Sequence, residues 1–579
     1  MVRLIGVLLI VLIAVVILIG SVRVEARSLG ATFTVTNTNG SGAGSLRQAI
    51  ADANNTPGAD IIRIATTGTV HLTSTLYITD DVTILGSGAD RFAVDGGSSV
   101  QVFNIGDVVG GGTVYVYTQL SMADVTVQNG HNEEGNGGAI GGLGSLTLTN
   151  VSLLNNTAQN GGGVDVSGDV ILNGGRFENN QCLIFQCEGG GLRTWGSLIL
   201  SGTQLVNNTA IGSGGGAAAL YARVNGGRFE NNHCAGVFPY LCNGGGLAAG
   251  INSILTGTQF VSNTANGDGG GLWVYGATQL SGVRFENNHC ALSSNVCFGG
   301  GMYAHTTASL TDTQFVRNTA IDGRGGGLSL GDMAQINGGR FAGNSASYGG
   351  GLSAIQGVSL TKTLFVSNSA LSDGGGLYFS SQTPAGIAST LNQVQLLHNT
   401  AGRRGGGVYL YGGLNAVNTL FAANAALSGT ALYLGFAGMG GNVDIRHITI
   451  GSSVPVTGAA IEVEAGRVNV INSIIANHSV GINRTDGTVT QDANLFVNNG
   501  VNMQGGVISG LIHPTGSPNF LNPALDDYRL GPGSAAIDQV GFAGVLVDFE
   551  GDVRPHGLRY DIGFDEYTLR AIYLPLIER

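Results

Sequence analysis

The chain of 579 residues contains 99 glycines, only 11% of its residues are charged, and its formal net charge is −12. This acidity excludes a nucleic-acid-binding protein, because such proteins need a basic surface for the phosphates. Lys362 is the only lysine, so lysine-based catalysis is nearly excluded. A globular chain of this length would form several domains, but a repeat runs through most of it and predicts one long solenoid.

Residues 1–26 read as an export signal. Arg3 precedes an uncharged apolar run from Leu4 to Val22, and small residues follow it. This pattern is typical of a cleaved signal peptide. An uncleaved N-terminal anchor is the alternative, because the run would nearly span a bilayer at about 1.5 Å per residue. We expect the body of the protein to be exported and to touch a membrane only through this segment.

Residues 27–65 are expected to form an N-terminal cap. Within them, Ser45–Asn54 has a helical pattern. A short helix here would cover the first coil of the solenoid and hide an otherwise open sheet edge.

Residues 66–515 carry the repeat, which has two signals. Glycine triplets recur every 24 to 31 residues between Gly161 and Gly405, and a Phe/Leu-x-x-Asn signal runs in step with them. Apolar and polar residues alternate around each Phe, so the segments are short strands separated by turns.

Such a period predicts an all-β fold, a single-stranded right-handed parallel β-helix of the pectate-lyase type with a short N-terminal capping helix. Coils stacked about 4.8 Å apart would place Phe on Phe in the interior and Asn on Asn at one turn. The predicted structural ladder comprises Phe177, Phe229, Phe260, Phe285, Phe315, Phe341, Phe365, Phe421, Asn180, Asn232, Asn263, Asn288, Asn318, Asn344, Asn368 and Asn424.

Six cysteines fall in three repeats whose loops are longer than the others. Each first Cys follows the repeat's Asn by two residues, and each second Cys precedes a Gly triplet by two. Equivalent cysteines lie two coils apart, beyond the ~7 Å reach of an unstrained bridge. We therefore predict the disulfides Cys182–Cys187, Cys234–Cys242 and Cys290–Cys297. Zinc is the alternative, because His233 and His289 adjoin cysteines, but no loop has four ligands.

A second period of two coils overlies the first. The residues around the inward position alternate between pairs such as Arg176 and Glu178 and pairs such as Gln204 and Val206. This charge pattern is either a ligand-binding stripe or a solvated sheet face with modest cross-strand pairs, and we favour the second interpretation.

Over residues 137–500, the Phe-x-x-Asn and Gly-Gly-Ala/Gly-Ile/Leu signals resemble the repeats of the chlamydial polymorphic outer membrane proteins. Residues 33–54 are similar to the CSLREA-type motif of bacterial surface β-helix proteins, with Gly44 at the place of its cysteine. Residues 527–566 resemble the C-terminal segment of the choice-of-anchor β-helix family. These resemblances imply a bacterial β-helix protein that is extracellular or associated with the outer membrane at the cell surface.

Residues 516–579 are expected to form a C-terminal cap and tail. Their acidic residues offer the oxygen ligands that suit Ca²⁺, but no known calcium spacing is present and arginines alternate with them. We favour structural salt bridges and predict no metal site and no cofactor. The acidic group comprises Asp526, Asp527, Asp538, Asp548, Glu550, Asp552, Asp561, Asp565 and Glu566.

A parallel β-helix is also a scaffold for polysaccharide lyases and glycoside hydrolases, which need paired carboxylates or Ca²⁺ with a basic residue in one groove. The loops beside the glycine turns offer charged candidates without a recognisable motif. We interpret them as solvated loop charges and predict no catalytic residue. They are Asp268, Asp322, Asp373, Arg324, Arg403 and Arg404.

The sequence thus favours an exported β-helix with a structural or adhesive role, in contact with glycans or proteins of the cell surface or matrix, and no enzyme. A polysaccharide lyase or glycosidase on the same scaffold is the first alternative. A non-catalytic carbohydrate-binding solenoid is the second. Each of these functions rests on analogy of fold.

Overall fold

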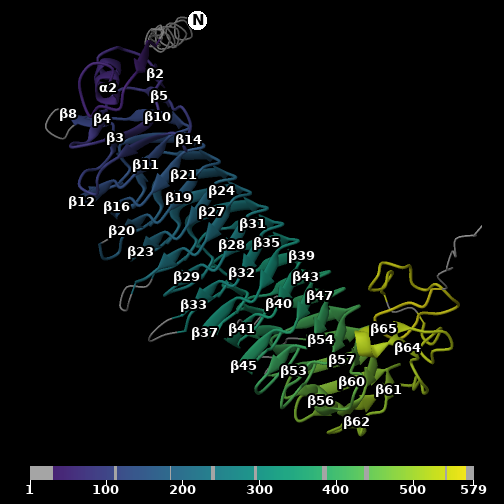
Figure 1. Cartoon of the computed structure of the whole chain (residues 1–579). Helices are drawn as coiled ribbons and strands as arrows, with labels where there is room; N and C mark the ends of the chain where they lie inside the picture. The colour runs from purple at the N-terminus through teal and green to yellow at the C-terminus, as the bar shows by residue number, and fades with distance from the viewer. Residues whose placement is uncertain are drawn as a thin grey trace, which may run out of the picture.

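The computed structural model describes residues 30–109, 114–182, 184–236, 242–291, 296–380, 388–435, 442–541 and 544–568. They form a long right-handed parallel β-helix (Figure 1). The leader or anchor expected at residues 1–26 lies outside these ranges. Within them, no helix combines the length and the hydropathy of a membrane span.

The N-terminal end of the β-helix is covered by one short helix, α2 (Leu46–Asn54), as predicted (Figure 1). The Ser45 hydroxyl accepts a hydrogen bond from the Gln48 N–H at 3.2 Å and so caps the first turn. Leu46 and Ile50 turn inward onto the first coil. Strand pairing starts at Thr32–Val35, inside the segment expected to be a cap.

Each regular coil contains four strands. The first two belong to a 33-stranded sheet, the third to a 17-stranded sheet and the fourth to an 11-stranded sheet. Pairing is parallel within all three sheets, and each strand pairs with its equivalents in the coils before and after it. The strands that follow the glycine turns form the first column of the 33-stranded sheet, and three of them, β21, β24 and β27, continue into the second column.

The first-column strands are β4 (Leu76–Ile78), β7 (Phe103–Ile105), β13 (Ile140–Gly142), β17 (Val164–Val166), β21 (Leu192–Ser201), β24 (Ala217–Asn225), β27 (Leu247–Thr256), β30 (Leu272–Val274), β34 (Met302–Ala304), β38 (Leu328–Leu330), β42 (Leu352–Ala354), β46 (Leu377–Ser380), β50 (Val408–Tyr411), β53 (Leu432–Leu434), β56 (Val456–Val463), β59 (His478–Arg484) and β62 (Val501–Gln504). The second-column strands are β1 (Thr32–Val35), β2 (Asp60–Ile64), β5 (Val82–Leu85), β10 (Thr118–Ala123), β14 (Gly144–Thr149), β18 (Val170–Asn173), β31 (Thr278–Ser281), β35 (Ala308–Thr311), β39 (Ala334–Asn337), β43 (Val358–Thr361), β47 (Ser389–Asn392), β51 (Leu414–Val417), β54 (Asn442–Arg446), β57 (Arg467–Ile471), β60 (Thr488–Asp492) and β63 (Ile508–Ser509).

The 17-stranded sheet consists of β3 (Gly68–His71), β6 (Phe92–Asp95), β11 (Thr126–Gln128), β15 (Ser152–Leu154), β19 (Arg176–Glu178), β22 (Gln204–Val206), β25 (Arg228–Glu230), β28 (Gln259–Val261), β32 (Arg284–Glu286), β36 (Gln314–Val316), β40 (Arg340–Ala342), β44 (Leu364–Val366), β48 (Gln395–Leu397), β52 (Leu420–Ala422), β55 (Thr449–Gly451), β58 (Ile474–Ala476) and β61 (Leu495–Val497). The 11-stranded sheet consists of β12 (His131–Asn136), β16 (Thr157–Asn160), β20 (Gln181–Cys182), β23 (Thr209–Ala210), β26 (His233–Cys234), β29 (Thr264–Ala265), β33 (His289–Cys290), β37 (Thr319–Arg324), β41 (Ser345–Tyr348), β45 (Ser369–Asp373) and β49 (Thr400–Ala401).

A row of stacked rings fills the interior beside the 17-stranded sheet. Phe229, Phe260 and Phe285 occupy one register and are fully buried. Their ring centroids lie 4.8 and 4.9 Å apart, the spacing of the coils. Burial of each ring contributes roughly 1.5–3 kcal/mol, so the row is a main source of stability.

A buried asparagine ladder runs along the next turn. The Asn263 side chain donates a hydrogen bond to Asn288 Oδ1 at 3.0 Å and another to the Phe229 carbonyl at 2.8 Å. In the other direction its own Oδ1 accepts from the Asn232 side chain at 2.9 Å. Each amide thereby joins neighbouring coils without leaving a buried polar atom unpaired.

The glycine triplets let successive coils approach closely. At Gly270 a Cβ atom would lie 2.3 Å from the Gly300 carbonyl oxygen, so a side chain there would push the coils apart. Gly299 has a φ of +72°, which other residues rarely adopt. The recurrence of these residues therefore reflects both packing and turn geometry.

The three long loops are each closed by a disulfide within one coil. The bonds join Cys182 to Cys187, Cys234 to Cys242 and Cys290 to Cys297, with Cα–Cα distances of 6.0, 5.7 and 6.1 Å. All six residues are buried. Such bonds indicate an oxidising compartment.

The charged pairs of the two-coil period satisfy one another on the outer face of the 17-stranded sheet. Arg228 forms a salt bridge with Glu230 of the same strand at 2.7 Å and donates to Gln259 of the next coil at 2.7 Å. Arg284 repeats the arrangement with Glu286 and Gln314. These contacts occupy the arginines and support the interpretation as a solvated sheet face.

The C-terminal segment lies along the side of the coils (Figure 1). Its short antiparallel pair, β64 (Phe520–Asn522) and β65 (Asp527–Leu530), is followed by irregular chain in residues 531–541 and 544–568. Gln393 and Asn418 donate hydrogen bonds to carbonyls of Asp548 and Val547 at 2.9 and 2.7 Å. These contacts fasten the segment to turns that precede the 17-stranded sheet.

Candidate functional site

An open groove crosses the outer face of the first five strands in the first column of the 33-stranded sheet, β4, β7, β13, β17 and β21. Its floor is the outward-facing position of β4, β7, β13 and β17, where Tyr77, Asn104, Gly141 and Asp165 pair in register. At the usual spacing of strands, the four coil steps from β4 to β21 cover roughly 19 Å. We call this feature the N-terminal groove.

Two adjoining hollows form this groove and share the residues Asn104, Gly142 and Leu143. The hollow nearer the N-terminus has a volume of about 510 Å³ and the other of about 310 Å³. The residues that line the two are Tyr77, Thr79, Asn104, Ile105, Gly106, Asp107, Asn132, Gly135, Asn136, Gly142, Leu143, Asp165, Val166, Ser167 and Trp195.

The hollow exists because β13 ends in two glycines. Gly141 and Gly142 present no side chain between Asn104 on one coil and Asp165 on the next. A Cβ at Gly141 would lie 2.2 Å from the Asn136 carbonyl oxygen. The backbone of β12 therefore packs directly against the backbone of Gly141. The floor is therefore low at its centre.

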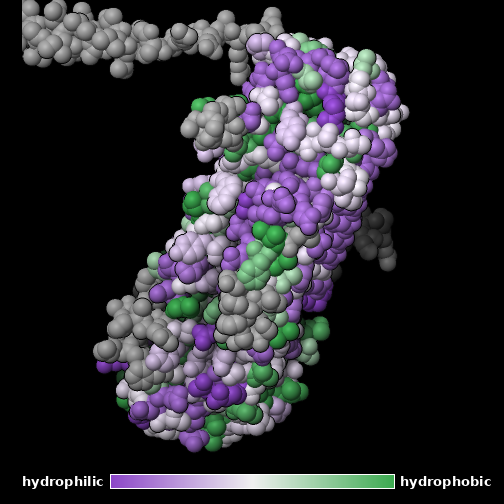
Figure 2. Space-filling view, turned by 90° about the vertical axis from the view of Figure 1, so that its left-hand side faces the viewer, coloured by the Kyte–Doolittle hydropathy of each residue, from purple (hydrophilic) through white to green (hydrophobic). Residues whose placement is uncertain are grey.

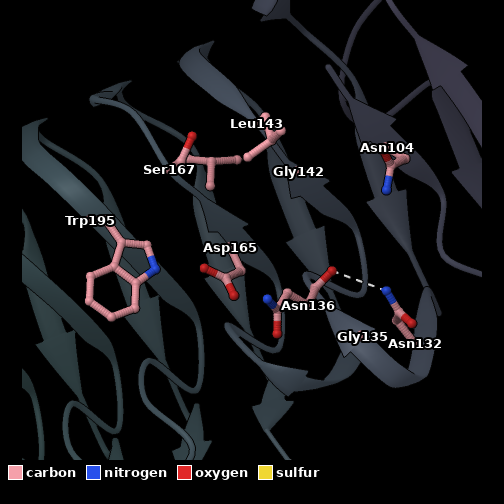
Figure 3. A pocket seen from close by; sticks show the side chains of 10 residues that line it. Asn104, Asn132, Gly135, Asn136, Gly142, Leu143, Asp165, Ser167 and Trp195 are labelled. Carbon is pink, nitrogen blue, oxygen red and sulfur yellow. Dashed lines mark hydrogen bonds between the residues drawn. The ribbon is translucent and has the colours of Figure 1, made fainter. Parts of the chain in front are cut away.

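An aromatic side chain stands at each end of the groove. Tyr77 is 61% exposed and Trp195 is 55% exposed. The pairing of β21 with β24 shifts register between Thr194 and Ser197, and Trp195 lies in this bulge. Bulges commonly re-aim a side chain, and here the indole stands out from the sheet. Figure 3 shows Trp195 and Asn104 on opposite sides of the second hollow, with Asp165 between them.

The single carboxylate of the second hollow is engaged by an arginine. Arg193 Nε and Nη2 lie 3.0 and 2.7 Å from the two oxygens of Asp165, whose side chain is only 3% exposed. Burial raises the pKa of Asp165, and the Arg193 guanidinium opposes this effect. The Arg193 Cζ atom also lies 5.1 Å from the centroid of the Trp195 ring. The Arg193 guanidinium, held by Asp165, thus packs against the indole ring in a cation–π contact.

Amide and hydroxyl groups make up the remaining polar lining. Strand β12 contributes Asn132, which donates to the Asn136 carbonyl at 3.1 Å (Figure 3). Asn104 donates to Gln101 Oε1 at 3.2 Å, and Ser167 accepts from the Gly144 N–H. Asparagine both donates and accepts hydrogen bonds, so these side chains match the hydroxyl groups of a sugar.

Four of the six loop charges lie further along the same face, and the structure corrects their interpretation as solvated loop charges. Asp373 is 2% exposed and binds Arg404 through both oxygens, at 3.0 and 2.9 Å. The Arg404 Cζ atom lies 4.8 and 5.0 Å from the ring centroids of Tyr409 and Tyr433. Asp373 and Arg404 are 31 residues apart in the chain and meet because successive coils stack. The Arg404 guanidinium then packs against a row of tyrosine rings.

This tyrosine row is closed to ligands on its ring faces. Tyr378, Tyr409 and Tyr433 stack with centroids 5.0 and 5.4 Å apart. The Arg324 Cζ atom lies 5.6 and 5.7 Å from Tyr348 and Tyr378. Because the rings cover one another, we assign this row to packing.

Asp268 lies in a half-buried aromatic cluster. Burial raises the pKa of its carboxyl to about 6, although Oδ1 accepts the Phe298 N–H at 2.8 Å. Tyr303 lies near it and contacts His305 Nδ1 through its hydroxyl at 3.1 Å. Asp322 and Arg403, in contrast, are exposed, as expected of loop charges.

The C-terminal acidic residues hold turns together. Asp548 Oδ1 accepts the N–H groups of Glu550, Gly551 and Asp552 at 2.8–2.9 Å. Arg554 and Glu566 form a fully buried salt bridge at 3.0 Å. Asp548, Glu550 and Asp552 bring one oxygen each within 4.8 Å of one another, but the turn contacts already account for Asp548.

Sequence reasoning did not find the N-terminal groove. Its floor lies mostly upstream of the regular triplets, where the repeat is weak. Two features of the sequence mark it in retrospect. Gly141 and Gly142 form a second glycine pair shortly after Gly137 and Gly138, and Trp195 is one of only two tryptophans in the chain.

No protein-family model matches the chain, and no curated protein matches it either. Among solved structures, a PL6 family alginate lyase, AlyGC, is similar at 9% sequence identity and a TM-score of 0.26. The similarity covers 84% of this chain and 99% of that chain.

Proposed function

We propose that the protein is an exported surface β-helix that binds glycan chains in the N-terminal groove and acts as an adhesive or structural component. The observation that carries this proposal is the open groove with an exposed aromatic ring at each end and asparagines between them. Sugar rings present apolar faces and hydroxyl edges, which fit aromatic platforms and amide groups respectively.

Export and surface location are part of the same proposal. Three disulfides support an oxidising environment. The repeats also resemble those of bacterial surface β-helix proteins.

The groove favours binding over cleavage. Glycosidases place two carboxyl groups about 5–9.5 Å apart, one of which attacks or activates water. Asp165 is buried, and both its oxygens accept hydrogen bonds from Arg193. A carboxylate held in this way is a poor nucleophile or base.

Binding is tested with the purified protein and a panel of soluble polysaccharides, by isothermal titration calorimetry. Trp195→Ala is expected to weaken binding about tenfold or more, because it removes an aromatic platform. Tyr275→Ala is the matched control, since Tyr275 is 52% exposed, directly follows β30 and lies outside the groove. Equal affinities of the two variants would contradict the proposal.

Polysaccharide cleavage is the second candidate function, and the observation that favours it is Asp268. A carboxyl with a pKa of about 6 near Tyr303, whose hydroxyl contacts His305, has the character of a general acid or base. We expect no shortening of pectin or alginate chains by the protein, with or without Ca²⁺. Shortening that Asp268→Asn abolishes would establish the enzyme and refute the purely adhesive role.

A further inference from the structure

The charges around the N-terminal groove are predominantly negative. None of the described residues that line the groove is Lys, Arg or His, whereas Asp107 and Asp165 both line it. Strand β12, which forms one wall, also carries the exposed residues Glu133 and Glu134. The chain as a whole has a formal net charge of −12.

Arg193, the cation that lies over the Trp195 ring, is already neutralised. Arg193 forms two hydrogen bonds with Asp165, and its side chain is 12% exposed. Glu188 is close enough to interact electrostatically with both members of this pair, and burial raises its pKa. The formal charges of Arg193, Asp165 and Glu188 therefore add up to a net negative charge when Glu188 is ionised.

We propose that the groove selects uncharged glycan chains and rejects acidic polysaccharides, an inference that rests on the proposed function. A carboxylate or sulfate group entering the groove would lose water without gaining a cationic partner, and the wall strand β12 carries the exposed carboxylates Glu133 and Glu134. Hydroxyl groups meet no such penalty, because Asn104, Asn132 and Asn136 supply neutral donors and acceptors.

The position of Trp195 agrees with this selectivity. One side of the indole is occupied by Arg193, which Asp165 neutralises. The ring therefore offers an apolar surface to a sugar face, without a free positive charge beside it that would attract an anion. Asp107 lines the other hollow, and none of the described residues that line either hollow is a cation.

The test compares neutral chains such as dextran, glucomannan and xylan with acidic chains such as alginate, polygalacturonate and heparin. Affinity is measured for the full chain and for Trp195→Ala at low and at high ionic strength. We expect at least one neutral chain to bind in a manner that depends on Trp195, with less than a twofold change between the two salt concentrations. We expect no acidic chain to bind at either.

The outcomes separate the two proposals. Binding of an acidic chain that Trp195→Ala weakens tenfold, and that high salt also weakens, would overturn the selectivity and leave the glycan-binding function standing. Binding of no chain at all would overturn both. Binding of neutral chains that Trp195→Ala leaves unchanged would remove the groove as the site and, with it, the selectivity.

Discussion

At the scale of single residues, the asparagine ladder shows how a buried polar group becomes a structural element. Asn288 accepts hydrogen bonds from the backbone N–H and the side chain of Asn263, both at 3.0 Å. Its own amide donates to the Phe260 carbonyl at 2.8 Å and to Asn318 at 2.9 Å. All four bonds are shielded from water, where an unpaired partner is costly.

We expect Asn288→Ala to lower the free energy of unfolding by roughly 2–4 kcal/mol, because it leaves buried donors and a carbonyl without partners. Chemical denaturation monitored by circular dichroism measures this loss. Gln279→Ala is the control, since Gln279 is exposed on β31 of the same coil. A ladder that contributed nothing would give the two variants the same midpoint.

Titration of Asp565 provides a second prediction at this scale. Burial, together with Asp548 and Glu550, raises the pKa of Asp565 to about 8, although Oδ2 accepts the Leu530 N–H. The folded protein therefore keeps a proton that the unfolded chain releases near pH 4. The stability contributed by this group is complete below pH 4 and is lost as the pH rises to about 8.

His447 acts in the opposite direction at lower pH. Burial, aided by the Arg554 charge, lowers its pKa to about 3, so its contribution is lost as the pH falls below about 6.5. Between pH 7 and 8 Asp565 is therefore the main titrating group of the C-terminal segment, since the pKa of Asp561 is raised only to about 6. We expect the stability of the C-terminal segment to fall by about 1–2 kcal/mol across this window. Asp565→Asn should flatten this dependence in hydrogen-exchange measurements, and an unchanged slope would show that another group titrates.

At the scale of elements, the interior columns could be predicted from the sequence because the spacing between Phe and Asn stays constant where the loops differ in length. Phe229, Phe260 and Phe285 keep the same distance to their Asn residues, while the loops that follow differ in length. Disulfide pairing followed from the same regularity. Side-chain alternation and turn residues are local, so one repeat is enough to place a strand.

The candidate site could not be predicted in this way. The groove floor combines Tyr77, Asn104 and Asp165, which are neighbours only because coils of unequal length stack in one register. The Arg404–Asp373 pair has the same origin, since its members belong to different coils. Trp195 owes its exposure to a bulge, which no periodic pattern marks. Contacts between coils and local bulges of this kind can be recognised only in the folded structure.

The aromatic column gives the prediction for this scale. Leu205 and Leu396 occupy the position of Phe260 in other coils, so Phe260→Leu should cost only about 1–2 kcal/mol. Phe260→Asp places an unpaired carboxylate between two stacked rings and should unfold several coils. Limited proteolysis should then cut near residue 260 in the aspartate variant alone. Similar protection of both variants would contradict the stacked interior.

At the scale of the whole molecule, the strands of each coil pair only with those of the neighbouring coils in the part of the chain that the structure describes, and the C-terminal segment fastens the last coils together. Gln393, Asn418 and His447 contact that segment across more than 100 residues of sequence. We therefore expect the C-terminal coils to unfold as one unit and the earlier coils to tolerate the removal of complete coils.

The last prediction joins this modularity to the site. Deletion of Phe229 through Arg284 joins Arg228 to Phe285 and removes two coils, since Arg228, Gln259 and Arg284 share one register. The shortened β-helix should fold, and it should bind a neutral glycan with unchanged affinity, because the groove ends at Trp195, before the deleted coils. Circular dichroism and calorimetry measure the two outcomes.

Removal of residues 229–243 instead, about half a coil, should disrupt the stack. A gradual loss of affinity in the folded two-coil deletion would show that binding is spread along the whole face and is not confined to the groove.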